Sequence, residues 1–176
     1  MKLVMDRLVI RNANAEDART LCKWWNDGAI MAHAGFPNGI GTTEQEVLNR
    51  ILADNDSSRR LILEVDGISI GEMSYSTVKE NTAGIGIKIC DFEQQEKGYG
   101  TLYLSMLIRF LFEQMGYTTI ILDTNVKNKR AQHVYEKLGF RQADVRMDSW
   151  RDQLGEPQSF IDYELTVDDF KKAAMI

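Results

Sequence analysis

The stretch Gln95-Glu96-Lys97-Gly98-Tyr99-Gly100-Thr101 decides how the rest of this chain is interpreted. Two glycines one residue apart remove side chains from a turn, and a long apolar segment with helical spacing begins directly after them. The first N–H groups of a helix lack backbone partners and lie at the positive end of the helix dipole. The stretch therefore predicts a loop and helix start that can hold a phosphate or diphosphate.

The segments on either side of this loop predict two strands joined by a crossover helix. Residues 82–90 form a strand candidate with isoleucine at every second position from 85 to 89. After the loop we expect a helix over about 99–115 and then a β-branched, buried strand over 119–124. Because a helix between two neighbouring strands usually joins a parallel pair, we expect these two strands to run parallel.

Capping and turn signals give the remaining elements. Asn14 caps a helix that runs to about Asn26, Thr43 and Glu46 form a capping box for a second helix, and Asp66-Gly67 is a hairpin turn. The other expected elements are strands at 8–11, 60–65, 68–78, 140–150 and 159–165 and a helix at 128–138. The order β-α-α-β-β-β-α-β-α-β-β predicts an α/β (α+β) fold with a mixed, mostly antiparallel central sheet flanked by helices.

Composition indicates one soluble domain spanning residues 1–176, with 44% hydrophobic and 27% charged residues. No apolar run has the length of a membrane span and no hydrophobic signal core is visible, so we expect a cytoplasmic protein without a membrane partner. A net charge of −5 argues against nucleic acid as a partner and suits a cationic amine. Cys22 and Cys90 form no disulfide framework, and no residues have metal-ligand spacing, so we expect no metal.

The glycine loop fits neither of the two best-known nucleotide motifs. No Lys-Ser or Lys-Thr pair follows Gly100, as a Walker loop requires, and the third glycine of a Rossmann fingerprint is missing. These absences disfavour an ATP- or NAD-binding domain. A tight strand-to-helix turn without any ligand stays open as an alternative for this segment alone.

A second motif lies about thirty residues further on, in the segment from Asn128 to Phe140. Ala131, Val134, Tyr135 and Leu138 are spaced to share one helix face. Taken alone, this spacing favours a buried tyrosine in the core, with its hydroxyl bonded to some other group.

Together the two segments resemble the signature motifs of the GNAT superfamily, the acyl-CoA-dependent N-acyltransferases. The family loop Arg/Gln-x-x-Gly-x-Gly/Ala is matched by Gln95, Gly98 and Gly100, and the second motif Asn-x-x-Ala-x-x-x-Tyr-x-x-x-Gly-Phe is matched from Asn128 onward. The expected element order also fits a GNAT-like fold. The opening strand and the run Trp24-Trp25-Asn26-Asp27 look like the branch of ribosomal-protein N-terminal, spermidine and aminoglycoside acetyltransferases.

The resemblance implies a set of residues that bind coenzyme A. Backbone amides of the loop would hold its pyrophosphate, Lys97 would add charge at the rim, and a backbone N–H between Ile87 and Ile89 would meet the thioester carbonyl. Tyr135 would lie near the sulfur and protonate the departing thiolate. The implied cofactor residues are Ile87, Ile89, Gln95, Glu96, Lys97, Gly98, Tyr99, Gly100, Thr101, Asn128, Ala131 and Tyr135.

The general base is less clear from the sequence, because Gly84 stands where related sequences often carry an acidic residue. Glu72, on the preceding strand, is the nearest substitute and could act directly or through water; a solvated strand carboxylate is the alternative. We expect acidic residues to attract a polyamine or aminoglycoside to the acceptor side, and His33 to contact substrate. These acidic residues are Asp27, Glu72, Asp148 and Asp152.

The resemblance thus implies an N-acetyltransferase that moves an acetyl group from acetyl-CoA to a primary amine by direct attack, since no cysteine is placed to carry the acyl group. The acceptor is a small amine or a protein N-terminus. The loops 35–41 and 150–158 decide between a closed pocket and an open groove. A catalytically lapsed acyl-CoA-binding regulatory module is the alternative, favoured by Gly84. Dimers are common in the resembled branch, so a homodimer is possible.

Overall fold

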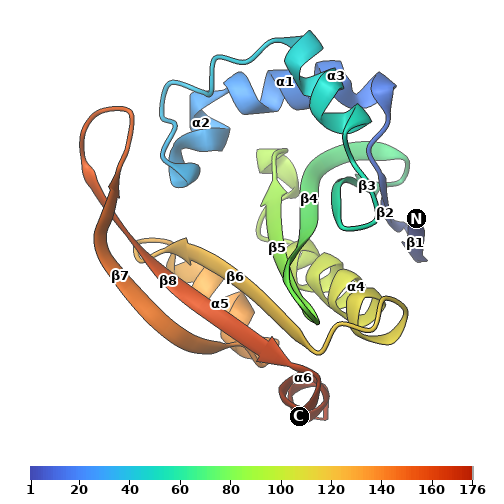
Figure 1. Ribbon diagram of the computed structural model, residues 1–176. Coiled ribbons are helices and arrows are strands. Elements are labelled where there is room, and N and C mark those ends of the chain that lie inside the picture. The colour runs from blue at the N-terminus through green and yellow to red at the C-terminus, as the bar shows by residue number, and fades with distance from the viewer. Residues whose placement is uncertain (176) are drawn as a thin grey trace.

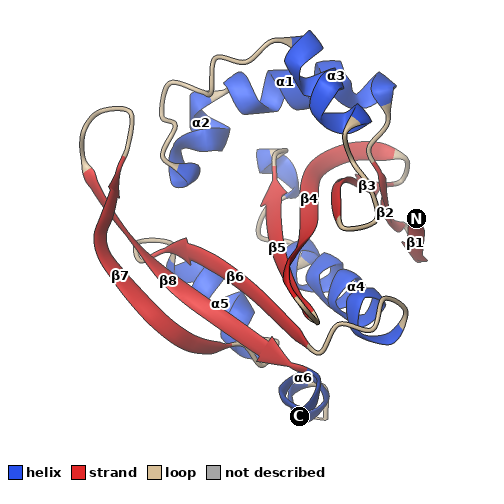
Figure 2. Cartoon of the chain, viewed as in Figure 1, coloured by secondary structure: helices blue, strands red, loops and turns tan. Residues whose placement is uncertain are grey.

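The computed structural model describes residues 1–175, and its central feature is a sheet of eight strands with helices on both faces (Figure 1, Figure 2). The strand order is β1-β2-β3-β4-β5-β6-β8-β7. Every neighbouring pair is antiparallel except β5 and β6. The strands are β1 (Lys2–Met5), β2 (Leu8–Asn12), β3 (Ser58–Val65), β4 (Ile68–Lys79), β5 (Thr82–Ile89), β6 (Thr119–Asn125), β7 (Arg141–Arg151) and β8 (Pro157–Thr166).

Helices cover the two faces of the sheet separately. On one face, α1 and α3 bury Leu21, Trp25 and Val47 against Ile62 of the sheet. On the other face, α4 and α5 pack on the larger core, which includes Leu61 and many other apolar side chains. The helices are α1 (Ala18–Asn26), α2 (Gly28–Met31), α3 (Glu44–Leu52), α4 (Tyr99–Glu113), α5 (Lys129–Lys137) and α6 (Val167–Ala173).

The predicted α/β class and mostly antiparallel sheet are confirmed, and so is the parallel pair joined through the crossover helix. Both expected helix starts are present: Thr43 and Glu46 form a capping box, and Asn14 caps a 3-10 turn that leads into α1. The structure adds β1, α2 and α6, which the sequence analysis did not predict. Two of these are short helices capped by Asp27 and Thr166, and the third is a four-residue strand that pairs only with β2.

The parallel pair separates after three residues. Thr82–Gly84 of β5 pair with Thr119–Ile121 of β6, and no pairing follows. Yet β5 stays paired with β4 as far as residue 89, and β6 stays paired with β8 as far as residue 125. The sheet therefore divides into two halves that are joined at one end and spread apart at the other (Figure 1).

A partly buried ion network fixes α1 to the sheet. The Arg11 guanidinium on β2 bonds both oxygens of Asp17, at 2.7 and 2.8 Å, and one oxygen of Glu64 on β3, at 2.7 Å. Burial by itself would raise the pKa of Asp17, but the hydrogen bonds from Arg11 and from the Asn14 N–H outweigh it and lower that pKa. Asp17 immediately precedes α1, so the network sets where this helix begins on the sheet.

Residues 1–175 contain neither a membrane-spanning helix nor a metal-binding cluster. None of their helices combines the length and the apolar character needed to cross a bilayer. Nor do these residues contain a cluster of three or more His, Cys, Asp or Glu side chains arranged to hold a metal ion.

Candidate active site

The gap between β5 and β6 forms part of a cavity of about 380 Å³. Its walls come from the end of β5, the glycine loop, the first turns of α4 and α5, and α2. Lys97 lies outside it, where its Nζ donates to Gln94 Oε1 at 3.2 Å. The expected cofactor residues that line it are Ile87, Ile89, Gln95, Glu96, Gly98, Tyr99, Gly100, Thr101, Asn128, Ala131 and Tyr135.

The glycine loop presents bare backbone to this cavity. Gly98 has a φ of 79° and precedes α4 without any side-chain cap, so no side chain occupies the first N–H groups of that helix. A Cβ added at Gly98 or Gly100 would meet no atom within 4 Å. The loop therefore leaves room for an anion at the positive end of a fifteen-residue helix.

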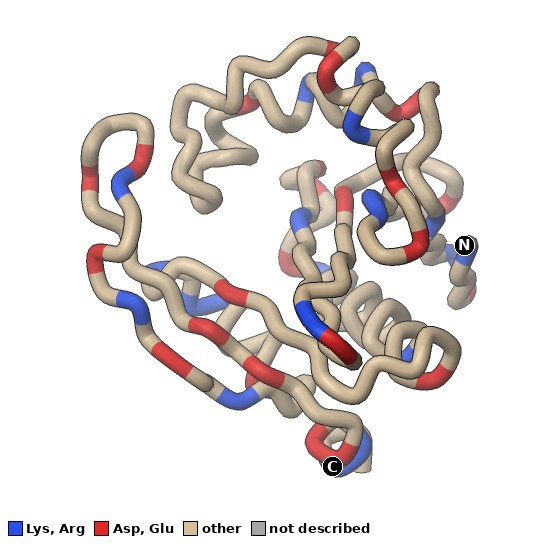
Figure 3. Tube along the Cα trace, viewed as in Figure 1, with Lys and Arg blue, Asp and Glu red and all other residues tan. Residues whose placement is uncertain are grey.

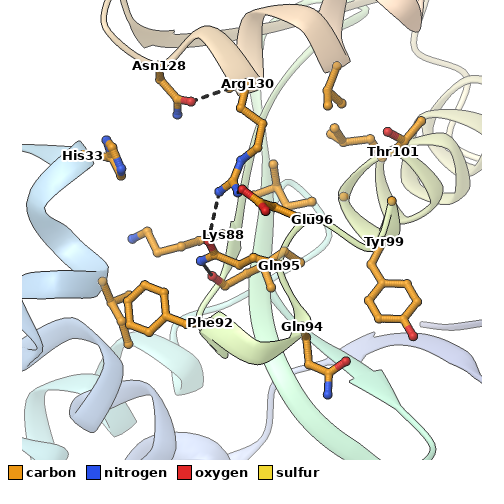
Figure 4. Close-up of a pocket in the computed structure, with 18 of the residues that line it drawn as sticks. His33, Lys88, Phe92, Gln94, Gln95, Glu96, Tyr99, Thr101, Asn128 and Arg130 are labelled. Atoms are coloured by element: carbon orange, nitrogen blue, oxygen red, sulfur yellow. Dashed lines mark hydrogen bonds and ion pairs between the residues drawn. The ribbon is translucent and has the colours of Figure 1, made fainter.

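Gln95 connects three elements around the cavity. Its Nε2 donates to the Ile89 carbonyl at 2.9 Å, and its Oε1 accepts from Arg130 Nη2 at 3.0 Å. Figure 4 shows the Arg130 side chain extending from α5 towards Gln95 and Glu96. The glutamine thus ties the end of β5 to the loop and to α5, which explains why a residue with both a donor and an acceptor suits this position.

The direction of the β5 backbone groups follows from one hydrogen bond. The Cys90 N–H donates to the Ile70 carbonyl on β4 at 2.8 Å. Because successive N–H groups of a strand point to opposite sides, the N–H groups of Ile89 and Ile87 point away from β4, into the gap on the β6 side. Because β5 has separated from β6 at this point, the N–H groups of Ile87 and Ile89 have no partner on β6.

Tyr135 extends from α5 to the same cavity. Its side chain is buried between the rings of Phe140 and Tyr163, with centroids 5.8 and 5.6 Å away. The hydroxyl donates to no described residue, and no buried side-chain oxygen in residues 1–175 lacks a partner, so this oxygen is open to the cavity it lines. Burial, together with the charge of Asp123, raises the pKa of Tyr135 to about 12, which keeps the phenol protonated at neutral pH.

Asn128 and His33 both line the cavity and lie towards the same side of it in Figure 4. The Asn128 Oδ1 caps α5 by accepting the Ala131 N–H at 3.1 Å, which leaves the two Nδ2 hydrogens unused among described residues. His33 belongs to the 3-10 turn Ala32–Ala34 that follows α2.

Glu72 lies in a second cavity, of about 430 Å³, on the face covered by α1 and α3. Its Oε1 accepts the Trp25 indole N–H at 2.8 Å and lies 3.6 Å from Lys88 Nζ. Ile87 and Lys88 line both cavities, so the two spaces meet at β5. Glu72 is therefore on the sheet beside the gap, as expected, with one hydrogen bond from Trp25 and a longer ion pair with Lys88.

The other acidic residues expected at the acceptor side do not line either cavity. Asp27 caps α2 by accepting the N–H groups of Ala29 and Ile30. Asp152 accepts two backbone N–H groups of its own turn and the side-chain amide of Gln158. Asp148 lies on β7 and bonds Ser159 through its N–H. Of the four acidic residues expected to attract a cationic amine, Glu72 is therefore the one that lines a cavity described above.

The two loops expected to shape the acceptor side contact each other. Gln153 Nε2 donates to the Gly39 carbonyl at 2.7 Å, and Gln153 Oε1 accepts the Asn38 N–H at 2.9 Å. Trp150 packs on Phe36, with ring centroids 5.8 Å apart. The tip of the β7–β8 hairpin is therefore bonded to the loop after α2, and Ile40 of that loop lines the second cavity.

Sequence analysis missed the two cations that line the first cavity, Lys88 and Arg130, and the three arginines that line the second, Arg50, Arg59 and Arg60. Lys88 interrupts an apolar strand between Ile87 and Ile89, and this pattern could have identified it. Arg130 lies on an exposed helix face, and nothing in its spacing predicts a bond to Gln95.

Comparisons with known proteins place this geometry in a family. Residues 7–141 match the family model described as an acetyltransferase (GNAT) domain. Among curated proteins, the chain is similar to the uncharacterised N-acetyltransferase YnaD of Bacillus subtilis (strain 168). The two are 26% identical over 144 residues, which is 80% of this chain and 83% of the relative.

Two solved structures share the fold closely. One is the spermidine N-acetyltransferase from Vibrio cholerae in complex with CoA and spermine, with a TM-score of 0.83 and 20% identity over 95% of this chain and 99% of that one. The other is the ribosomal-protein-S5-alanine acetyltransferase from Vibrio fischeri, with a TM-score of 0.78 and 17% identity over 97% and 98%.

The two loop glycines are expected to differ in their effect on stability. Gly98→Ala places a Cβ on a residue with a φ of 79°, which costs roughly 1–2 kcal/mol. Gly100 has no such constraint and lies inside α4, so Gly100→Ala is expected to raise stability by about 0.5–1 kcal/mol. Urea unfolding of the two variants measures the difference; an equal loss in both would contradict the assigned loop conformation.

Proposed function

We propose that this chain, which belongs to the GNAT acetyltransferase family, transfers an acetyl group from acetyl-CoA to the primary amine of a small molecule. The observation that carries the proposal is the pair of cavities at β5. A cavity lined by a bare helix N-terminus and by Tyr135 shares Ile87 and Lys88 with a second cavity. One end suits a diphosphate, and the other has room for an amine.

On this proposal, the donor lies in the gap between β5 and β6. The N–H groups from Gln95 to Thr101 bind the diphosphate, and the Asn128 amide donates to the pantetheine arm. The Ile87 or Ile89 N–H, left unpaired by β6, donates to the thioester carbonyl and stabilises the oxyanion that develops there.

The acetyl group then moves by direct attack. The acceptor nitrogen bonds to the thioester carbon, the carbon–sulfur bond breaks, and Tyr135 gives its proton to the leaving sulfur. Two observations support a route without an acyl-cysteine. Cys90 is buried, which raises the pKa of its thiol, and neither Cys22 nor Cys90 lines a cavity described above.

A small acceptor is favoured over a folded protein surface. Gln153 bonds the tip of the β7–β8 hairpin to the loop after α2, at Gly39 and Asn38. A protein N-terminus would need an open groove between these two segments.

Replacing Tyr135 by phenylalanine tests the proposed function together with its acid. Tyr135→Phe should lower kcat for CoA release about 100-fold or more, while the Kd for acetyl-CoA stays within about twofold. Turnover is measured as CoA release from acetyl-CoA with a pooled panel of primary amines. Tyr163→Phe removes the neighbouring hydroxyl and should leave turnover unchanged, since that group bonds Glu136 instead. Binding of acetyl-CoA without any release by the wild type would favour a lapsed, regulatory module.

We propose Glu72 as the group that accepts the amine proton, directly or through water. Glu72→Gln keeps an oxygen for the Trp25 N–H but removes the base, so kcat should fall about 100-fold with the acetyl-CoA Kd unchanged. Glu80→Gln, on the exposed turn between β4 and β5, is the matched control. An unchanged kcat in Glu72→Gln would show that the Glu72 carboxylate has a structural role and is not the base.

A further inference from the structure

The second cavity carries more positive than negative side chains. Its one carboxylate is that of Glu72, and the cations that line it are Arg50 from α3, Arg59 and Arg60 from β3, and Lys88 from β5. A cavity made to receive a polyamine would present the opposite balance, because its walls would have to compensate several ammonium groups.

Trp25 holds the two arginines. The Arg50 and Arg60 guanidinium carbons lie 5.6 and 5.7 Å from the centre of its ring, at cation–π distance. Arg60 is also bonded to Asp54, at 2.9 Å, so its charge is compensated. Arg50 has no carboxylate within 4 Å among residues 1–175, and its side chain is exposed. It is a positioned cation without a counter-ion.

Lys88 brings a second cation to the point where the cavities meet. Its Nζ lies 2.9 Å from Met31 Sδ and 3.6 Å from Glu72 Oε1, so the pair with Glu72 is longer than a hydrogen bond. An ammonium has three donors, and these contacts leave at least one for a ligand. Ser74 and Ser76 also line the cavity and offer hydroxyl donors to an anion.

We infer that the acceptor amine also carries a carboxylate, or a comparably compact anionic group, which binds between Lys88 and Arg50 in the second cavity. The inference rests on the proposed function, since it names the class of acceptor for that reaction. The amine of such a molecule lies at the gap beside Ile87, and its anionic end extends over β4 towards α3. Strands lie about 4.8 Å apart, so the chain between the two groups spans up to roughly two strand spacings.

Acidic residues lie at the other half of the sheet, in a third cavity that shares Ser74, Ser76 and Gly86 with the second one. Positions along β6 and β8 are acidic (Figure 3), and Asp123, Asp162 and Glu164 line a third cavity there. Arg146 bonds both Asp123 and Asp162 at 2.7 Å. One guanidinium offsets only one of the three carboxylate charges, so the negative charge of this third cavity is reduced and not removed.

The test compares amines that differ only in charge at the far end. L-alanine, γ-aminobutyrate and ε-aminocaproate are each assayed against their carboxamides, with spermidine as a separate acceptor. At least one acid should exceed its amide about tenfold in kcat/KM, the effect of one charge-assisted hydrogen bond. The amine of alaninamide is less basic than that of alanine, so it is more often neutral at the assay pH and should react faster. A preference for alanine would therefore underestimate the effect of its carboxylate.

Variants test whether Arg50 and Lys88 cause the preference for acids over amides. Arg50→Gln and Lys88→Met should each lower the acid-to-amide ratio about tenfold, and Lys88→Arg should restore it. Lys23→Met removes a cation from the exposed face of α1 and should not change the ratio. Because Arg50 is exposed, its variant stays folded even where a change at Lys88 weakens the protein. Amides or spermidine used as well as the acids would overturn the inference and leave the proposed function intact.

A lack of turnover with every amine would overturn the proposed function instead. Titration of ε-aminocaproate and its amide into CoA-saturated protein then decides the inference by itself. Binding of the acid alone, lost in Arg50→Gln, would support an anion site, and equal or absent binding of both would refute it.

Discussion

The three-residue contact between β5 and β6 is the constraint on which the rest of this structure depends. If the two strands stayed paired, their backbone groups would satisfy each other and the sheet would have no gap. Because they separate, the groups beyond Gly84 need other partners. The Ile89 carbonyl takes the side chain of Gln95, whereas the N–H groups of Ile87 and Ile89 face the cavity. The gap is thus lined by backbone N–H groups without strand partners. The pairing of β5 with β4 and of β6 with β8 holds the two sides of the gap in place.

The two faces of the sheet contribute different residues to the site. The face with α4 and α5 supplies the glycine loop and the Tyr135 hydroxyl, which suit the donor. The face with α1 and α3 supplies Glu72 and the cations around Trp25, which suit the acceptor. Lys88 and Ile87 lie where the two meet. Trp25 is central on the acceptor face because it binds Glu72 through its N–H and both arginines through its ring.

Local chemistry made much of this predictable from the sequence. The capping boxes at Asn14 and Thr43, the Asp66-Gly67 turn and the glycine loop each depend on residues a few positions apart, and all lie where expected. Features that depend on contacts between distant segments were not predictable in this way. The 3.6 Å pair of Lys88 with Glu72 and the stacking of Arg50 and Arg60 on Trp25 exist only once β3, β4, β5 and the two helices are assembled.

If the gap between β5 and β6 binds an acyl-CoA, calorimetric titration of acetyl-CoA into the purified protein will show saturable binding near micromolar Kd, about −8 kcal/mol. ATP should be inert under the same conditions. Gly100→Val should weaken that binding, because its side chain extends into the open space beside the loop. No binding of acetyl-CoA, or equal binding of ATP, would contradict the account.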